Sequence, residues 1–121
     1  MNDAKFLSTY FEKLDSNGMD VLPLLSPNFT FSVLWSDDAG AHEFAGGWDE
    51  FHGYLAQRDP DGQLHHIDVG IREGRREVVL GHTTRHGERL ATFTFAAWLD
   101  DEGRAERLYA ARTLVFGDPD A

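Results

Sequence analysis

Residues 64–99 read LHHIDVGIREGRREVVLGHTTRHGERLATFTFAAWL, and this stretch decides the fold. Apolar and polar residues alternate along it, and two glycine-containing pairs, Gly74-Arg75 and His86-Gly87, interrupt the alternation. Such pairs are typical of two-residue turns between antiparallel strands. Together with the residues that follow as far as Phe116, the stretch predicts an antiparallel meander of four strands.

The two turns predict the register of this meander. If both loops have two residues, Glu73 pairs with Arg76 in the first hairpin and Val78 pairs with Phe95 in the second. Because side chains alternate along a strand, the inner face should carry His65, Ile67, Val69, Ile71, Val78, Leu80, His82, Phe93, Phe95, Ala97 and Leu99. The outer face should carry His66, Asp68, Gly70, Val79, Gly81, Thr83, Thr92, Thr94, Ala96 and Trp98.

The composition limits the class of protein. The chain has 121 residues, 11 basic and 21 acidic, with a net charge of −10 and no cysteine. The negative charge argues against nucleic acid and anionic membranes as partners, and the lack of cysteine excludes disulfides and thiolate sites. No signal peptide or membrane span is visible, so we expect a cytoplasmic protein. We expect a single domain over residues 1–121, with a core at about 5–116 and an acidic tail at 117–121.

The first half of the chain predicts helices and a hairpin. Apolar residues at helical spacing predict a helix from Asp3, its expected cap, to Asn17, and Asp20 should cap a second short helix. Residues 29–35 alternate as a strand does, and a short strand is expected at 42–45. A third helix should follow Gly46-Gly47 and carry Trp48, Phe51, Tyr54 and Leu55 on one face. Helices segregated from a largely antiparallel sheet indicate the α+β class.

Several phrases in this order resemble the nuclear transport factor 2-like superfamily. They are YFEKL at 10–14 followed by NGMD at 17–20, LLSPNFTF at 24–31, FAGG at 44–47 and LDDEGR at 99–104. The superfamily includes ketosteroid isomerases, SnoaL-like cyclases, limonene epoxide hydrolases and scytalone dehydratases. The resemblance implies a cone-shaped curved sheet around the first helix, a cavity open at one end, and frequent dimerisation through the outer face of the sheet.

The resemblance also implies where catalytic carboxylates should lie. Matching the phrases places Val33 at the base position of ketosteroid isomerases and Phe95 at the position of their second acid. Ala110 matches an aspartate of the epoxide hydrolases, and only Tyr10 coincides with a family residue. Since the predicted inner face carries no acid, the reactions that depend on these carboxylates are not expected here.

Three kinds of polar side chain remain as candidates for the cavity. His65 and His82 should be diagonal neighbours on the inner face, as general acid and base or as histidines that complete hydrogen bonds at the rim. Tyr10 is either an oxyanion partner or a core tyrosine bonded to the backbone. Alternation along Leu108, Ala110, Arg112 and Leu114, with the family match, directs Arg112 inward.

Arg112 has two interpretations. It is a binding group for a carboxylate or enolate oxygen, or it reaches the rim and pairs with Asp37, Asp38 or Glu43. The six histidines do not assemble a ligand set, so neither a metal nor a cofactor is expected.

The sequence therefore predicts a protein that binds a small apolar or ring-containing molecule with a carbonyl or carboxylate. As an enzyme it would be an isomerase, cyclase or dehydratase that lacks the usual catalytic carboxylates. The predicted catalytic residues are His82, His65 and Tyr10, and the predicted ligand-binding residues are Tyr10, Phe31, Trp35, Tyr54, His82, Phe93, Phe95 and Arg112. The alternative is a non-catalytic dimeric module with a filled cavity. A homodimer is expected through an apolar outer patch of Thr92, Thr94, Ala96, Trp98 and Tyr109.

Overall fold

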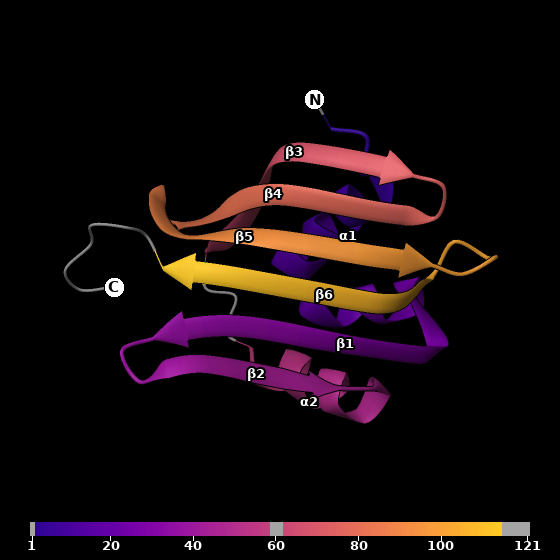
Figure 1. Ribbon diagram of the computed structural model, residues 1–121, viewed down its shortest axis with the longest axis horizontal. Coiled ribbons are helices and arrows are strands. Elements are labelled where there is room, and N and C mark those ends of the chain that lie inside the picture. The colour runs from indigo at the N-terminus through magenta and orange to yellow at the C-terminus, as the bar shows by residue number, and fades with distance from the viewer. Residues whose placement is uncertain (1, 59–61, 115–121) are drawn as a thin grey trace.

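The structure, a computed structural model, describes residues 2–58 and 62–114, and a six-stranded sheet is its largest element. The strands are β1 (Leu25–Asp37), β2 (Gly40–Gly46), β3 (Gln63–Glu73), β4 (Arg76–Arg85), β5 (Glu88–Leu99) and β6 (Ala105–Leu114). Their order across the sheet is β2-β1-β6-β5-β4-β3 (Figure 1). All neighbours are antiparallel except β1 and β6, which run parallel. The predicted mixed, mainly antiparallel sheet is confirmed.

The helices lie on one face of this sheet. They are α1 (Lys5–Ser16), the 3-10 helix η1 (Gly18–Leu24) and α2 (Trp48–Gln57), all behind the strands in Figure 1. α1 packs against β3 and β4, whereas α2 packs against β1 and β2. Asn17, rather than the predicted Asp20, caps η1 by accepting a hydrogen bond from the Met19 N–H at 3.3 Å. The predicted α+β class is confirmed.

The N-terminus of α1 is capped from the sheet. Asp3, the predicted cap, does not cap the helix, which has no local side-chain cap. Instead, the Glu77 carboxylate on β4 accepts hydrogen bonds from the N–H groups of Phe6 at 3.1 Å and Leu7 at 2.8 Å. Glu77 is fully buried, and Arg72 donates to the same carboxylate at 3.0 Å. A residue 70 positions away thus satisfies backbone donors that every helix leaves free at its start.

Both predicted tight turns of the meander are present. Glu73 pairs with Arg76, and Arg85 pairs with Glu88. The second turn has positive φ at both central residues, His86 and Gly87, as a type I′ hairpin turn requires.

Two bulges change the register beyond these turns. Asp68 in β3 and Leu90 in β5 each lack a partner, so the pairing shifts by one residue at both points. As a result Phe95 pairs with Val79, and the predicted pairing of Phe95 with Val78 is wrong.

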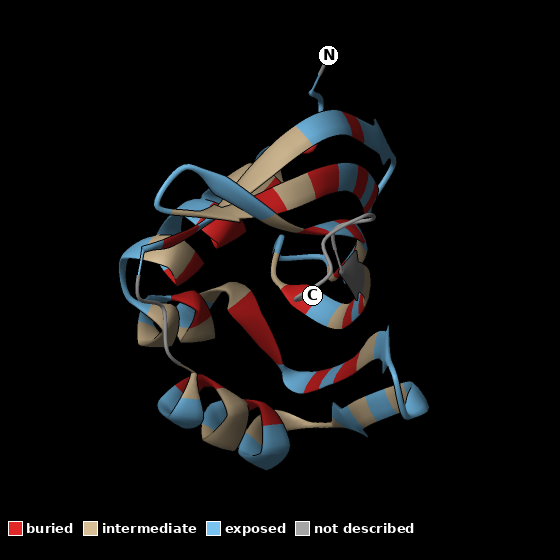
Figure 2. Ribbon diagram, turned by 90° about the vertical axis from the view of Figure 1, so that its left-hand side faces the viewer, coloured by how far each residue is buried: buried red, intermediate tan, exposed pale blue. Residues whose placement is uncertain are grey.

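The bulges also correct part of the predicted inner face. In β3, β4 and β5, the residues that face the helices include His65, Ile67, Gly70, Glu77, Val79, Gly81, Thr83, Ala91, Phe93, Phe95, Ala97 and Leu99. The predicted inner residues Val69, Ile71, Val78 and Leu80 lie on the outer face and are 41%, 56%, 44% and 51% exposed. Figure 2 shows the alternation as bands of buried and exposed residues along the strands.

Two glycines on the inner face, Gly81 and Gly70, leave no space for a larger residue without a shift of their neighbours. A Cβ atom on Gly81 would lie 2.6 Å from Cζ of Phe93, and one on Gly70 would lie 3.1 Å from Cβ of Ala4. Both glycines are therefore required at these positions by close packing, while Val69, Ile71, Val78 and Leu80 point outward.

The ends of the predicted domain are only partly described. The side chain of Leu114, Phe116 at the end of the predicted core and the acidic tail at 117–121 lie outside the described residues. Within the two described ranges, no helix is long and apolar enough to cross a membrane.

Candidate functional site

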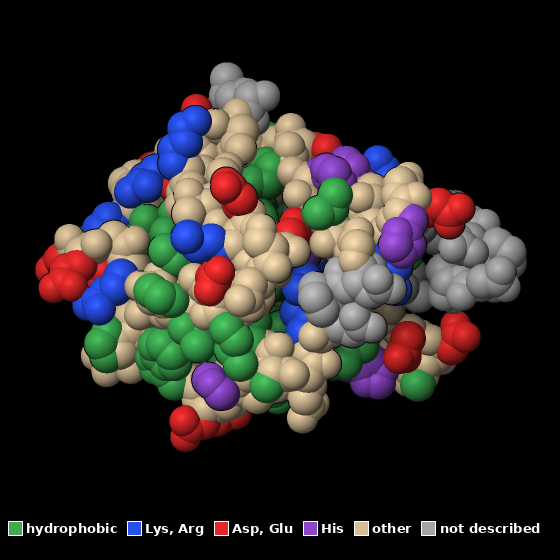
Figure 3. Space-filling model, turned by 180° about the vertical axis from the view of Figure 1, so that it is seen from behind, with side chains coloured by type: hydrophobic (Ala, Val, Ile, Leu, Met, Phe, Trp, Pro, Cys, Tyr) green, Lys and Arg blue, Asp and Glu red, His purple; other side chains and the backbone are tan. Residues whose placement is uncertain are grey.

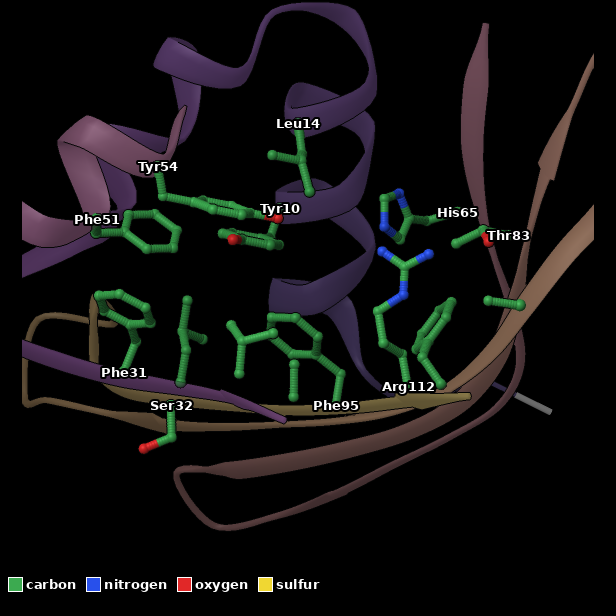
Figure 4. A pocket seen from close by; sticks show the side chains of 15 residues that line it. Tyr10, Leu14, Phe31, Ser32, Phe51, Tyr54, His65, Thr83, Phe95 and Arg112 are labelled. Carbon is green, nitrogen blue, oxygen red and sulfur yellow. The ribbon is translucent and has the colours of Figure 1, made fainter. Parts of the chain in front are cut away.

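A cavity of about 70 Å³ lies between the helices and the inner face of the sheet (Figure 4). Its apolar lining residues are Leu14, Phe31, Val33, Phe51, Ala91, Phe93, Phe95, Leu108 and Ala110. Its polar lining residues are Tyr10, Ser32, Tyr54, His65, Thr83 and Arg112. Pockets for drug-sized ligands measure roughly 300–1,000 Å³, and a water molecule occupies about 30 Å³ in the liquid. The cavity therefore has room for a few water-sized groups.

Most of the predicted site residues line this cavity. The structure brings together Tyr10, Phe31, Tyr54, His65, Phe93, Phe95 and Arg112. Trp35 and His82 do not line it. Trp35 is 37% exposed and stacks on His42, with ring centroids 5.3 Å apart.

His82 lies on the opposite side of the sheet from the position that the sequence predicted. It pairs with His66 across β3 and β4, and the two rings stack at 4.8 Å. Nδ1 of His82 is 3.0 Å from Asp68, and Nε2 of His66 is 2.8 Å from Oγ1 of Thr84. The bulge at Asp68 places His82 opposite His66, so the predicted pair of inward histidines is wrong.

His65 is held by an aspartate from α1. Its Nδ1 lies 2.6 Å from Oδ1 of Asp15, and its backbone N–H donates to Oδ2 of Asp15 at 2.7 Å. Because a carboxylate oxygen accepts hydrogen bonds, the contact with Asp15 favours a proton on Nδ1, and a ring with that single proton keeps a lone pair on Nε2. The ring also stacks on Phe11 at 4.8 Å with an interplanar angle of 4°. These contacts fix both the tautomer and the orientation of the imidazole.

A buried arginine lies behind this pair. Nη2 of Arg58, which follows α2, is 4.0 Å from Oδ1 of Asp15, and Nη1 donates to the Leu14 carbonyl at 3.3 Å. The side chains of Arg58, Asp15 and His65 are 9%, 11% and 13% exposed. Three groups from α1, β3 and the end of α2 thus form one nearly buried array.

Arg112 enters the cavity from β6. Figure 4 shows its guanidinium directed toward the ring of His65. Across the part of the chain that the structure describes, no hydrogen bond or ion pair joins Arg112 to a side chain, including Asp38 and Glu43. Asp37 is engaged by His42 at 2.8 Å, and this hydrogen bond is the main reason that the pKa of Asp37 is lowered. The predicted rim pairing is therefore absent, and the inward position of Arg112 remains.

Tyr10 presents a neutral phenol to the cavity. Burial, with a smaller effect from Tyr54, raises the pKa of Tyr10 far above its ordinary value. The phenol therefore stays protonated and can donate a hydrogen bond, but it does not act as a base. The structure shows no hydrogen bond from its hydroxyl to any described residue, so the expected backbone partner is absent.

The positions that the resemblance matched to catalytic carboxylates of ketosteroid isomerases and epoxide hydrolases also lie at this site. Val33, Phe95 and Ala110 all line the cavity, and none of its described lining residues is an acid. The expectation that the inner face carries no acid is nevertheless wrong, because Glu77 is buried there. Asp15 is a further carboxylate, and it reaches His65 from the helix.

Sequence reasoning missed Asp15, although one signal could have found it. Asp15 stands four residues after Phe11, so it continues the helical stripe that packs on the sheet. The alternation argument covers only acids on the strands. For Glu77 and Arg58 the local sequence carries no comparable signal, because their partners are 70 and 43 residues away.

No metal centre is evident among the described residues. They contain no group of three or more histidine, cysteine, aspartate or glutamate side chains that could hold an ion.

Comparisons with known proteins show the fold. No protein-family model matches the chain, and no curated protein sequence matches it. A loop-truncation variant of IdmH is similar in structure at a TM-score of 0.70 and 11% identity, over 90% of this chain and 91% of the other. SalBIII, an epoxide hydrolase/cyclase-like enzyme of pyran ring formation in salinomycin, is similar at a TM-score of 0.65 and 14% identity, over 89% of this chain and 88% of the other. A putative ketosteroid isomerase from Kribbella flavida is similar at a TM-score of 0.63 and 16% identity, over 95% of this chain and 80% of the other.

Proposed function

We propose that this chain, which has the nuclear transport factor 2-like fold, binds a small molecule in its cavity and moves a proton on it. The observation that carries the proposal is the Asp15–His65 pair at the cavity wall. We also propose that the chain acts in a reducing compartment such as the cytoplasm, where proteins without disulfides are usual; the chain has no cysteine.

His65 is the general base and then the general acid in this proposal. Nε2 takes a proton from a carbon or oxygen of the bound molecule, and the ionised Asp15 stabilises the imidazolium that forms. The same nitrogen returns the proton to another atom. The neutral Tyr10 phenol donates a hydrogen bond to the oxygen on which negative charge develops.

The reaction class follows from the single proton that His65 takes and returns. A base that takes and returns one proton carries out isomerisation, or elimination when a leaving group departs. Structural neighbours described as a ketosteroid isomerase, a polyketide cyclase and an epoxide hydrolase/cyclase-like enzyme support such a use of the fold. Because no carboxylate lines the described cavity, the proton falls to His65 rather than to a strand acid.

Proton exchange in deuterium oxide tests the proposal even while the substrate is unidentified. The protein is incubated with a panel of small ketones, enones and organic acids, and loss of carbon-bound protons is followed by proton NMR. We expect the wild type to exchange at least one compound about 100-fold faster than His65→Gln, the usual contribution of a general base.

His52→Gln is the matched control, because His52 is an exposed histidine on α2. It should exchange the same compounds at the wild-type rate. If His65→Gln matches the wild type on every compound of the panel, the proton-transfer function is wrong.

A second candidate function rests on the outer face of the sheet. The exposed residues Ile71 and Val78 are followed across the strands by Ala96 and Tyr109 in one continuous row. Val69 and Leu80 form the next row, beside an open groove of about 510 Å³ lined by Leu34, Leu80, Thr94 and Ala111 among others. Trp98 and Tyr109 are 36% and 37% exposed on this face. Such a continuous apolar surface is typical of an interface, so we propose that it pairs with a second copy of the chain.

Light scattering after size-exclusion chromatography tests this homodimer. Val78→Lys places a charge in the middle of the apolar rows and should convert a dimer to a monomer, whereas Asp49→Lys on α2 should leave the dimer intact. A wild type that stays monomeric at millimolar concentration would exclude the homodimer and leave the proposal for the cavity unaffected.

A further inference from the structure

Four of the eight other arginines in the described part of the chain, Arg58 among them, pair with an acid, whereas Arg112 does not. Arg72 pairs with Glu77, Arg75 with Asp101, and Arg104 with Glu102. In Figure 3 most of the Lys and Arg side chains lie in the left half of the view. These basic groups are neutralised within the protein, but Arg112 has no such partner among the described residues.

The surroundings of Arg112 make an unpaired charge unfavourable. Its strand neighbours are Phe93 on β5 and Trp35 on β1, and neither can neutralise a guanidinium. Asp15, the carboxylate of the nearby array, is already engaged by His65 and Arg58. A partly buried guanidinium without an acid needs an anion or water to satisfy its donors.

The cavity is polar at one end and apolar at the other. Arg112 and His65 lie together at one side of Figure 4, and Phe31 and Phe51 lie at the far side. A ligand that satisfies both ends carries its negative group at Arg112 and its apolar part between the aromatic rings. The volume of about 70 Å³ restricts that apolar part to a few carbon atoms.

We infer that the substrate is a small monocarboxylic acid whose carboxylate binds Arg112 and whose short apolar part points into the cavity. The planar guanidinium matches a carboxylate with two parallel hydrogen bonds. This orientation brings the carbon atoms next to the carboxylate toward Nε2 of His65. The inference rests on the proposed function, because it names the substrate class for the proton transfer.

Binding of butyrate and of its neutral isostere butyramide tests the inference by NMR titration. We expect the wild type to bind butyrate at least tenfold more tightly than butyramide. Arg112→Gln should lose that tenfold preference, and Arg112→Lys should retain part of it, since an ammonium keeps the charge without the planar pair of donors. The NMR spectra of both variants show directly whether they remain folded.

Two further variants separate this inference from the proposed function. Arg89→Gln removes an exposed arginine on β5, outside the cavity lining, and should leave butyrate binding unchanged. His65→Gln should bind butyrate within threefold of the wild type while it loses proton exchange. Equal binding of butyrate and butyramide, or equal butyrate binding by wild type and Arg112→Gln, overturns the substrate class. Selective binding of butyrate by a wild type without proton exchange overturns the proposed function and leaves a carboxylate-binding protein.

Discussion

Helix α1 is joined to the sheet by a carboxylate at each end, and the two ends differ in their surroundings. At the N-terminal end, Glu77 of the sheet is fully buried, accepts from the helix backbone and also binds Arg72. At the C-terminal end, Asp15 of the helix accepts from the backbone and ring of His65 beside the cavity. A carboxylate that accepts hydrogen bonds thus fixes the helix at its buried N-terminal end, and another orients an imidazole beside the cavity at its C-terminal end.

The packing differs in the same way. At the N-terminal end, the backbone of β3 lies so close to the first residues that Gly70 has no room for a side chain. At the C-terminal end, a Cβ atom on Gly18 would meet its nearest neighbour, Leu55, at 3.5 Å, an ordinary contact. We infer that the N-terminal end supplies stability and that the C-terminal end serves the site.

Replacement of Glu77 should have the largest effect on stability. Glu77→Ala leaves the N–H groups of Phe6 and Leu7 and the guanidinium of Arg72 without their shared acceptor. We expect a loss of about 3 kcal/mol in the free energy of unfolding, measured by urea denaturation. Glu73→Ala, at an exposed glutamate on the neighbouring strand, is the control and should change it by less than about 0.5 kcal/mol. A loss below about 1 kcal/mol for Glu77→Ala would contradict the comparison.

Two glycine substitutions compare the packing of the two ends. A Cβ atom at Gly70 would lie 2.1 Å from Oδ1 of Asn2, which already accepts from the Ala4 N–H, so that contact must break. We expect Gly70→Ala to cost about 1–2 kcal/mol by thermal or urea unfolding. Gly18→Ala should stay within about 0.5 kcal/mol of the wild type. Equal losses at the two positions would remove the difference in packing.

The sequence predicted the elements of this fold well because their signals are local. The helical spacing of Tyr10, Phe11 and Leu14, and the glycines of the two hairpin turns, depend on residues a few positions apart. The faces of the central hairpin were predicted less well, since single unpaired residues at Asp68 and Leu90 reverse the alternation without a signal of their own. The sequence predicted Val69, Ile71, Val78 and Leu80 as buried, whereas the structure places them on the exposed outer face.

The site residues were likewise predicted where their signal is local and missed where it depends on a distant partner. His65 was found from the phase of its strand, and Tyr10 and Arg112 were found from the phase of their helix or strand together with the family resemblance. Asp15 acts only through its contact with His65, 50 residues away, and Glu77 only through the start of α1. A pattern within one element cannot show a partner on another element. The sequence therefore predicted His82 beside His65, whereas the structure places Asp15 there.

Asp15→Asn should have a much smaller effect on stability than Glu77→Ala and a clear effect on His65. The amide oxygen still accepts one hydrogen bond, so we expect a loss of about 1 kcal/mol, well below that of Glu77→Ala. The fixed tautomer should disappear, because the amide no longer selects a proton on Nδ1. Nitrogen-15 NMR of the histidine rings measures this: the neutral wild-type ring should be protonated at Nδ1, and the variant should show a mixture. Unchanged ring signals in Asp15→Asn would mean that the carboxylate at the C-terminal end only joins the helix to the sheet, as Glu77 does at the other end.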